Sequence, residues 1–214
     1  MVKSLTRNRR RPAALLGLLV LFACAAELPH VAVAQSQSAV EAPVEESARA
    51  ERAPVISSVA VRPGGDQIAT AGDDHLIRIW NREDGKLLQV LRGHRDWVRA
   101  IAYSAEGSQL FSVADDRQLR CWDPQTGRGR FDFPSARNAL CDLAVSPDGA
   151  HVAVVGFDRT VQIYSVAERK VVRSIETGCT QLRCVAFSPQ GNTLVTGGQC
   201  GKVYVCDIAG PRQP

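Results

Sequence analysis

A repeat of 42 residues runs through the chain from residue 55 and constrains its fold more than any other feature. Residues of the same kind recur at this spacing without an insertion. Four sets of positions show the register: Val59, Ile101, Leu143 and Val185; Gly65, Gly107, Gly149 and Gly191; Asp74, Asp116, Asp158 and Cys200; and Trp80, Trp122, Tyr164 and Cys206. A fixed period of this length indicates stacked supersecondary units, each packed against its neighbours.

Each unit has the pattern of four short strands. The first strand alternates, as in 101–103, and ends in a Pro/Gly turn such as SPDG at 146–149. An apolar run, a tight turn with Asp and a strand ending on an aromatic residue follow, and KLLQVL at 86–91 or KVVRSI at 170–175 supplies the fourth strand. Helical repeats of similar period exist, but these runs are too short and too β-branched for helices. The sequence predicts an all-β chain: a β-propeller of four-stranded antiparallel blades, with four blades present.

The first 34 residues have the pattern of a signal peptide. Five Lys and Arg residues precede an uncharged run of fourteen residues, 13–26, which is shorter than the roughly 18–20 residues that cross a bilayer. Small residues at 32 and 34 predict cleavage before Gln35 and export to the periplasm or medium, with no membrane span in the mature chain. A lipobox-like sequence at 21–24 offers acylation of Cys24 as an alternative, although Phe22 is bulky for that motif. Residues 35–54 contain no aromatic residue and predict a flexible linker.

Charge and cysteine usage narrow the function classes. The net charge of +4 resides in the leader, and residues 35–214 are formally neutral, which argues against a nucleic-acid partner. Six cysteines remain after residue 34, an even number that permits disulfides in an exported protein, although the sequence does not say which would pair. No spacing typical of a metal site occurs, and we expect no metal and no cofactor.

Residues 93–123 resemble a WD repeat, with a Gly-His pair and a Trp-Asp pair separated by 27 residues. The resemblance extends over residues 55–214, but only the second unit has both dipeptides. It implies a hydrogen-bonded structural tetrad of His94, Ser112, Asp116 and Trp122, with partial tetrads built from Thr70, Asp74, Trp80, Asp158 and Thr196. A buried carboxylate and a buried indole N–H both need partners, which gives such a tetrad a physical reason.

The same residue types make up a hydrolase triad, so a catalytic interpretation is the alternative to the structural one. The other units have lost His and several partners, as a structural network can and a catalytic one cannot. No Gly-x-Ser-x-Gly turn is present. We therefore expect no catalytic residue and no enzymatic activity.

The resemblance also implies a rim where partners dock. It maps onto Trp97, Arg99, Asp73, Asp115, Phe157, Gln181 and Arg183. Exposed Trp and Arg side chains are frequent energetic anchors of interfaces. Alternatively, Trp97 packs over the edge of the blade. The sequence does not favour either role, docking or packing, over the other.

The resemblance further implies a ring of seven or eight blades, whereas this chain supplies units at 55–96, 97–138, 139–180 and 181–214, the last without its outer strand. Three explanations stay open: a fragment of a longer product, which is favoured; self-association of two halves; or a closed small ring. The expected function is a non-enzymatic, exported scaffold that presents its rim to a protein or peptide. The alternative is the sensory or docking portion of a larger exported enzyme.

Overall fold

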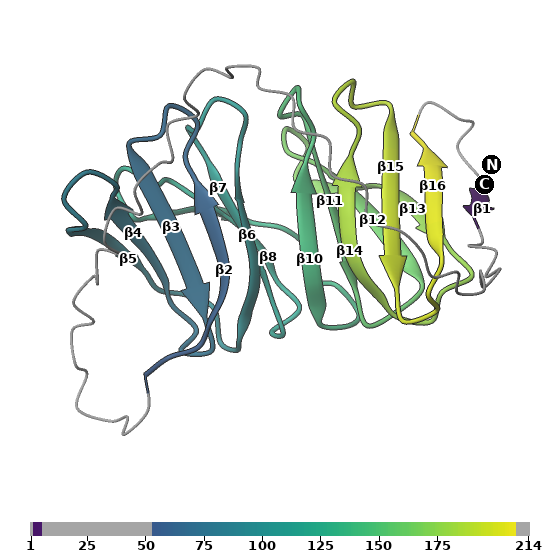
Figure 1. The fold of residues 1–214 in the computed structure, drawn as a ribbon, viewed down its shortest axis with the longest axis horizontal. Coiled ribbons are helices and arrows are strands. Elements are labelled where there is room, and N and C mark those ends of the chain that lie inside the picture. Colours follow the sequence, from purple (N-terminus) through teal and green to yellow (C-terminus); the bar gives the residue numbers. More distant parts are fainter. Residues whose placement is uncertain (1, 6–52, 209–214) are drawn as a thin grey trace, which may run out of the picture. The chain divides into compact units, whose positions relative to one another are not determined.

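The computed structural model describes residues 2–5 and 53–208, and in this part of the chain every regular element is a β-strand (Figure 1). The strands form four antiparallel sheets of four strands, which confirms the all-β fold and the blade architecture predicted from the repeat. The first sheet, blade 1, contains β2 (Ile56–Val61), β3 (Gln67–Gly72), β4 (Ile77–Asn81) and β5 (Leu87–Leu91) in that order.

Blades 2 and 3 repeat this order. Blade 2 contains β6 (Val98–Tyr103), β7 (Leu110–Ala114), β8 (Leu119–Trp122) and β9 (Gly129–Asp132). Blade 3 contains β10 (Leu140–Val145), β11 (His151–Gly156), β12 (Thr160–Ser165) and β13 (Lys170–Glu176). The first two strands of both blades shift register two residues after the first strand begins, as they also do in blades 1 and 4. The local geometry therefore repeats with the sequence.

Blade 4 differs from the expectation in its outer strand. It contains β14 (Leu182–Phe187), β15 (Thr193–Gly198) and β16 (Val203–Asp207), and β1 (Val2–Leu5) pairs antiparallel with β16. The outer strand expected to be missing is thus supplied by residues at the start of the chain, not by the linker. The rest of the predicted signal peptide and residues 35–52 of the linker lie outside the described residues.

The turns between the first two strands of each blade explain the repeated glycine. Gly65, Gly107, Gly149 and Gly191 all have φ between 69° and 77°, in the left-handed region that glycine adopts at little cost. In blades 2, 3 and 4 the amide of this glycine closes the turn by donating to the carbonyl of the serine three residues earlier. The register of every blade therefore starts from a turn that the sequence specifies locally.

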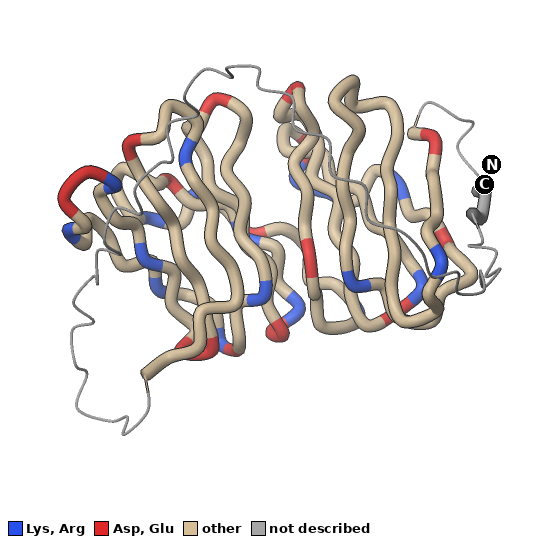
Figure 2. The backbone as a smooth tube through the Cα atoms, viewed as in Figure 1, with Lys and Arg blue, Asp and Glu red and all other residues tan. Residues whose placement is uncertain are grey.

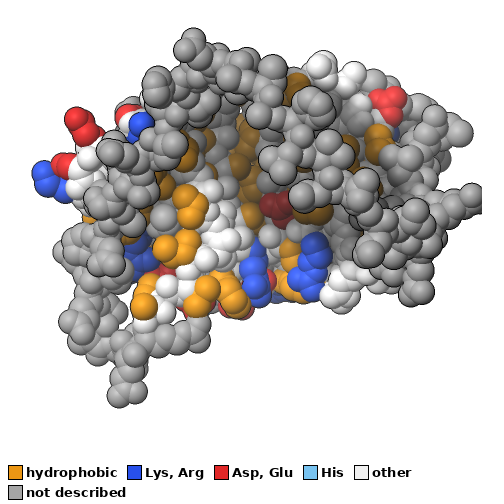
Figure 3. All heavy atoms as spheres, in the orientation of Figure 1, with side chains coloured by type: hydrophobic (Ala, Val, Ile, Leu, Met, Phe, Trp, Pro, Cys, Tyr) orange, Lys and Arg blue, Asp and Glu red, His pale blue; other side chains and the backbone are white. Residues whose placement is uncertain are grey.

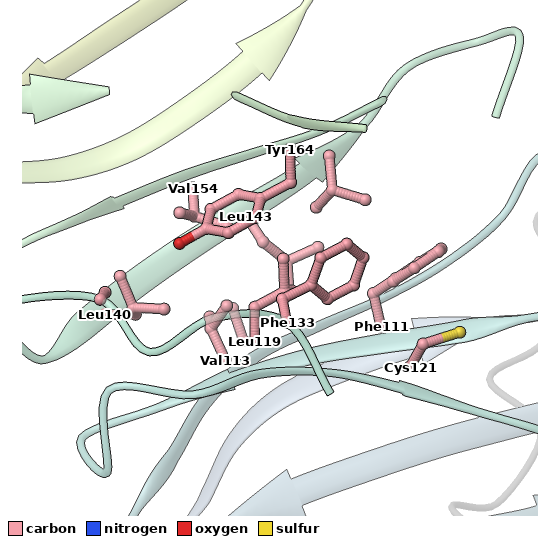
Figure 4. Packing of buried hydrophobic residues seen from close by; sticks show 12 residues of the cluster. Phe111, Val113, Leu119, Cys121, Phe133, Leu140, Leu143, Val154 and Tyr164 are labelled. Atoms are coloured by element: carbon pink, nitrogen blue, oxygen red, sulfur yellow. The ribbon is translucent and has the colours of Figure 1, made fainter. Parts of the chain in front are cut away.

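The core consists of three apolar layers, one between each pair of successive blades. Alternate residues of a strand point to opposite faces, so blades 2 and 3 each contribute to two layers and the end blades 1 and 4 to one. Between blades 2 and 3, Phe133 packs edge-on against Tyr164 at 5.3 Å and at an angle to Phe111 at 6.5 Å between ring centroids (Figure 4). Val113 and Leu119 lie in the same layer and are fully buried.

The described blades do not close a ring. Val59 on blade 1 is 59% exposed, although its counterparts one, two and three repeats later are 6%, 6% and 7% exposed. At the other end, Val203 on blade 4 is 44% exposed, whereas its counterparts in the other blades are 0% exposed. Each end of the stack therefore presents a face that is buried in the other blades.

Candidate functional site

The four residues of the proposed tetrad come together in blade 2. His94 precedes β6, Ser112 lies on β7, Asp116 lies in the turn after β7, and Trp122 ends β8. The His94 ring places Nδ1 2.8 Å from Asp116 Oδ2 and Nε2 2.7 Å from Ser112 Oγ. The Trp122 indole N–H donates to Ser112 Oγ at 2.8 Å. The chain of contacts ties two strands of the blade, β7 and β8, to the loop before β6 and to the turn after β7.

Asp116 is held as a carboxylate by its neighbours. Burial pushes the pKa of Asp116 upward, but hydrogen bonds from His94 and from the backbone N–H groups of Arg95 and Gln118 outweigh it, so the pKa lies below its ordinary value. The Arg95 and Gln118 amides donate at 3.0 Å each. With a carboxylate at Nδ1, the His94 tautomer that matches this site carries its proton on Nδ1 and accepts the Ser112 hydroxyl proton at Nε2.

This pattern of hydrogen bonds is that of a Ser-His-Asp triad, but its surroundings differ from those of a nucleophile. Ser112 is 0% exposed, and the Trp122 N–H already occupies a lone pair of its oxygen. A nucleophile needs room for a substrate carbonyl and donors for the developing oxyanion. The buried geometry favours a bracing role for Ser112, in line with the structural interpretation.

Blade 1 retains half of this network and replaces the rest. The Trp80 indole N–H donates to Thr70 Oγ1 at 2.9 Å, as in blade 2. Asp74 accepts the Leu76 amide at 3.2 Å and pairs with Arg78 Nη1 at 2.6 Å. Arg78 was not singled out from the sequence. The sequence signal for this ion pair was an arginine four residues after the turn Asp in a unit that lacks the His.

Blade 3 retains only the carboxylate. Asp158 accepts the Thr160 amide at 2.8 Å and the side-chain amide of Asn138 at 3.1 Å. Tyr164 replaces the indole, and its hydroxyl donates to Gln162 Oε1 at 2.9 Å. Asp158, Asn138 and Gln162 line a small pocket at the position where the other members of the tetrad have been lost.

In blade 4 the residues at the tetrad positions make different contacts. The Thr196 hydroxyl donates to the backbone carbonyl of Cys184 at 2.8 Å, and no indole is available to it because Cys206 stands in the aromatic position. Cys200 occupies the position of the turn Asp and forms a disulfide with Cys179. Sequence reasoning left the pairing open, although the register of Cys200 pointed to this turn.

The rim residues of blade 2 form a stacked cluster. The Arg99 guanidinium lies 3.8 Å from the centroid of the Trp97 ring and binds both carboxylate oxygens of Asp115, with Nε contacts of 2.9 and 3.0 Å. The hydrogen bond to Asp115 raises the pKa of Arg99 against the opposing effect of burial. Trp97 Nε1 is buried without a hydrogen-bond partner among the described residues. Asp115, one of the predicted rim residues, orients Arg99.

A second cluster joins the rims of blades 3 and 4. The Arg183 guanidinium lies 4.6 Å from the centroid of the Phe157 ring and donates to Gln181 Oε1 at 3.2 Å. Arg183 also approaches the Cys141 sulfur at 3.9 Å. Burial raises the pKa of the Cys141 thiol, and Arg183 opposes this rise.

The two clusters lie at the same end of the blades, because Arg99 and Arg183 are two repeats apart and each is the second residue of the first strand of its blade. Figure 2 shows basic positions, in blue, along the lower edge of the blades. Figure 3 shows basic side chains beside hydrophobic ones along this edge. The last of the predicted rim residues, Asp73, accepts the Val55 amide at 2.8 Å. Together, the residues of the two clusters (Trp97, Arg99, Asp115, Phe157, Gln181 and Arg183) are called the rim surface below.

Metal-binding clusters and membrane-spanning helices are absent from residues 2–5 and 53–208. No group of three or more His, Cys, Asp or Glu side chains among these residues could hold a metal ion. The same residues contain no helix long and apolar enough to cross a membrane.

Similar proteins share single repeats with this chain. It is 46% identical over 43 residues to the probable serine/threonine-protein kinase PkwA of Thermomonospora curvata, which is 20% of this chain and 6% of that protein. It is 40% identical over 48 residues to the general transcriptional corepressor TUP1 of Saccharomyces cerevisiae, 22% of this chain and 7% of that protein. An uncharacterized WD repeat-containing protein of Nostoc sp. is 44% identical over 46 residues, 22% of this chain and 4% of its own length. The chain thus spans a small part of these relatives.

The match to a protein family is far more extensive. The WD domain, G-beta repeat family matches residues 48–81, 85–123, 131–165 and 169–207, which is more than half of the chain. Each of the last three matches begins at the outer strand of one blade and ends with the third strand of the next. Since the period, the blades and these four matches coincide, the chain belongs to the WD domain, G-beta repeat family.

Proposed function

We propose that this chain is an exported, non-enzymatic scaffold whose rim surface holds a protein or peptide partner. WD repeats generally mediate protein–protein interactions. The observation that carries the proposal is the paired stacking of Arg99 on Trp97 and of Arg183 on Phe157 along one edge of the blades. Arginine and aromatic side chains that are rigidly held are the usual anchors of interfaces.

The two clusters offer different chemistry to a partner. Arg99 is neutralised by Asp115, so it supplies a flat stacked surface with Trp97. Arg183 contacts a neutral amide and a thiol, and it is exposed. A carboxylate of the partner would therefore bind at Arg183, where it gains a charge-assisted hydrogen bond.

The test is a crosslinking and affinity experiment. A photo-crosslinking residue at position 181 identifies the partner in the native host, and its affinity is then measured with purified proteins. R183E weakens binding at least about 10-fold, the size expected for a lost charged anchor. The matched control is R128E, since Arg128 is an exposed arginine in the turn between β8 and β9, at the other end of the strands. Equal affinity of R183E and wild type would place the partner elsewhere.

Export is supported by the basic head and apolar run at the N-terminus and by the disulfide in blade 4, because disulfides persist in oxidising compartments. Cleavage before Gln35 would remove β1 and leave β16 as the edge of blade 4. N-terminal sequencing of the protein recovered from its host tests this. A mature chain that begins at Gln35 supports export by a cleaved leader, and a chain that keeps residues 2–5 contradicts it. A lipid-modified N-terminal Cys24 would establish the lipoprotein alternative.

We further propose that the two exposed end faces, on blade 1 and blade 4, mediate self-association. Val59 on blade 1 and Val203 on blade 4 stand at positions whose counterparts meet inside the three apolar layers. Figure 3 shows exposed hydrophobic side chains where Figure 1 places β2 and β3. Blade 1 of one copy would therefore pack on blade 4 of a second copy, and two such contacts close a symmetric dimer.

Light scattering of the purified chain tests the pairing. We expect a dimer for the wild type and a monomer for V59D, which buries a charge in the contact. L88D is the matched control, because Leu88 is an exposed apolar residue on the outer strand β5. A wild-type chain that stays a folded monomer at micromolar concentration would exclude the pairing.

The docking portion of a larger enzyme is the second candidate. It is favoured by one observation, the 46% identity to a protein named as a probable serine/threonine-protein kinase, of which this chain covers 6%. Reading the DNA on both sides of the coding region tests it. A catalytic signature in frame supports this candidate, and additional 42-residue repeats alone support a scaffold.

A further inference from the structure

We propose that the Cys179–Cys200 disulfide is a redox-dependent brace that takes the place of the His–Asp link in blade 4. The inference begins from register. Two repeats after Asp116 the turn position is occupied by Cys200, and Cys179 stands two repeats after Arg95, whose amide binds Asp116. The disulfide therefore joins the same two segments that the tetrad joins in blade 2: the approach to the first strand and the turn after the second.

The geometry around the disulfide agrees with this role. The two Cα atoms lie 5.4 Å apart, within the range that a disulfide spans. The Cys200 amide donates to Cys179 Sγ at 3.3 Å, so a hydrogen bond joins the same two segments as in blade 2, but its donor lies in the turn, whereas in blade 2 the donor is the Arg95 amide and the acceptor is the turn Asp116. Cys179 is fully buried. Cys141 and Cys184, in contrast, are free thiols on the accessible part of the blades.

Blade 4 needs such a brace because the His and Trp of the tetrad are absent from it. Gly178 replaces the His, and a side chain there would meet the Tyr204 hydroxyl at 2.9 Å. Cys206 replaces the Trp, which leaves the Thr196 hydroxyl bound only to a backbone carbonyl. A covalent bond between Cys179 and Cys200, which are 21 positions apart, restricts the unfolded chain and thereby stabilises the folded blade.

The brace can be opened by a dithiol. The attacking thiolate forms a mixed disulfide, and its second thiol then closes a cyclic disulfide. The S–S bond of the protein is broken, two cysteine thiols form, and the dithiol supplies both electrons and both protons. Reduction frees the segment that leads to Gln181 and β14. The inference does not depend on which partner the rim surface binds.

Thermal unfolding of the full chain with and without dithiothreitol tests the proposal. Alkylation and peptide mapping of the oxidised chain should recover residues 179 and 200 linked. Reduction should lower the melting temperature by about 5–15 °C, the shift expected for a disulfide in a chain of this size. C179A/C200A should melt at the reduced temperature and show no further effect of dithiothreitol.

A rescue variant separates the brace from a mere loss of packing. C179A/C200D restores the turn carboxylate, which can accept the amide two residues on, as Asp158 does in blade 3. It should melt above C179A/C200A, and dithiothreitol should not change its melting temperature. C184S is the control for thiol chemistry and should respond to dithiothreitol as the wild type does. An oxidised chain without the link, or a reduced chain with an unchanged melting temperature, would overturn the proposal.

Discussion

Removal of the Ser112 hydroxyl should destabilise the fold by an amount that follows from its two contacts. S112A leaves His94 Nε2 and the Trp122 indole N–H without a partner, and Ser112 is 0% exposed, so water does not replace the hydroxyl. Each buried group left unsatisfied costs about 1–3 kcal/mol, which gives about 2–6 kcal/mol for the two. For a chain of this length, that lowers the melting temperature by about 4–24 °C.

The other blades supply graded controls for S112A. T70V removes one side-chain partner, since the Trp80 N–H donates to Thr70, and Trp80 is only half-buried. T196V removes a single bond to a backbone carbonyl. We expect about 1 kcal/mol for T70V and less for T196V. Urea or thermal unfolding should therefore rank S112A as the most damaging, T70V as intermediate and T196V as the mildest.

Two results would refute the reasoning. Equal destabilisation by S112A and T196V would mean that the contacts to His94 and Trp122 contribute nothing to stability. A hydrolytic activity that S112A abolishes without a change in melting temperature would show that the hydroxyl is a nucleophile. The three variants should also be compared for partner binding at a temperature where all of them are folded, and there a bracing role predicts unchanged affinity.

Three further perturbations address the turn carboxylates and the turn backbone. Because the pKa of Asp116 is lowered on folding, the carboxylate stabilises the fold above about pH 4, and this stabilisation is lost as the pH falls. In urea titrations, the stability advantage of wild type over D116N should therefore shrink below that pH. R78M removes the cation paired with Asp74 and should cost about 1 kcal/mol by thermal unfolding, whereas R128E, without such a pair among the described residues, should leave stability unchanged. G201A places a methyl group on a residue with φ of 66° and should cost about 1 kcal/mol, while G129A in the extended strand β9 should not destabilise. A larger loss for G129A than for G201A would contradict the backbone argument.

The blades were predictable because each is specified by local sequence. The alternation of apolar residues sets which side of a strand is buried, and the repeated glycine sets the turn before the second strand. Val98 and Leu140 are buried for the same reason at the same register position. The outer strand of blade 4 was not predictable, since the pairing of β1 with β16 joins residues about 200 positions apart.

The candidate site was predictable to the extent that its contacts stay within one repeat. His94, Ser112, Asp116 and Trp122 meet because β7, β8 and the preceding loop are neighbours in every blade. The contact of Arg183 with Cys141 crosses from one blade to the next, and a repeat pattern read one unit at a time does not contain it. The role of Asp115 in orienting Arg99 depends on side-chain direction, which the spacing leaves open.

A comparison of the four turns shows which member of the tetrad the fold needs most. Asp74, Asp116 and Asp158 each accept the amide two residues later, at 3.2, 3.0 and 2.8 Å, whereas His is retained in blade 2 alone among the described blades. In blades 1 and 2 the residue after this Asp is a non-glycine with φ of 66° or 67°. In blade 4, where the carboxylate is absent, that residue is Gly201 and a disulfide holds the turn. In blade 3 the residue after the turn Asp, Arg159, does not have a positive φ. The three turns with a left-handed residue therefore have either a carboxylate that accepts the amide two residues later or a glycine with a disulfide, and His joins the brace only where the carboxylate is already present.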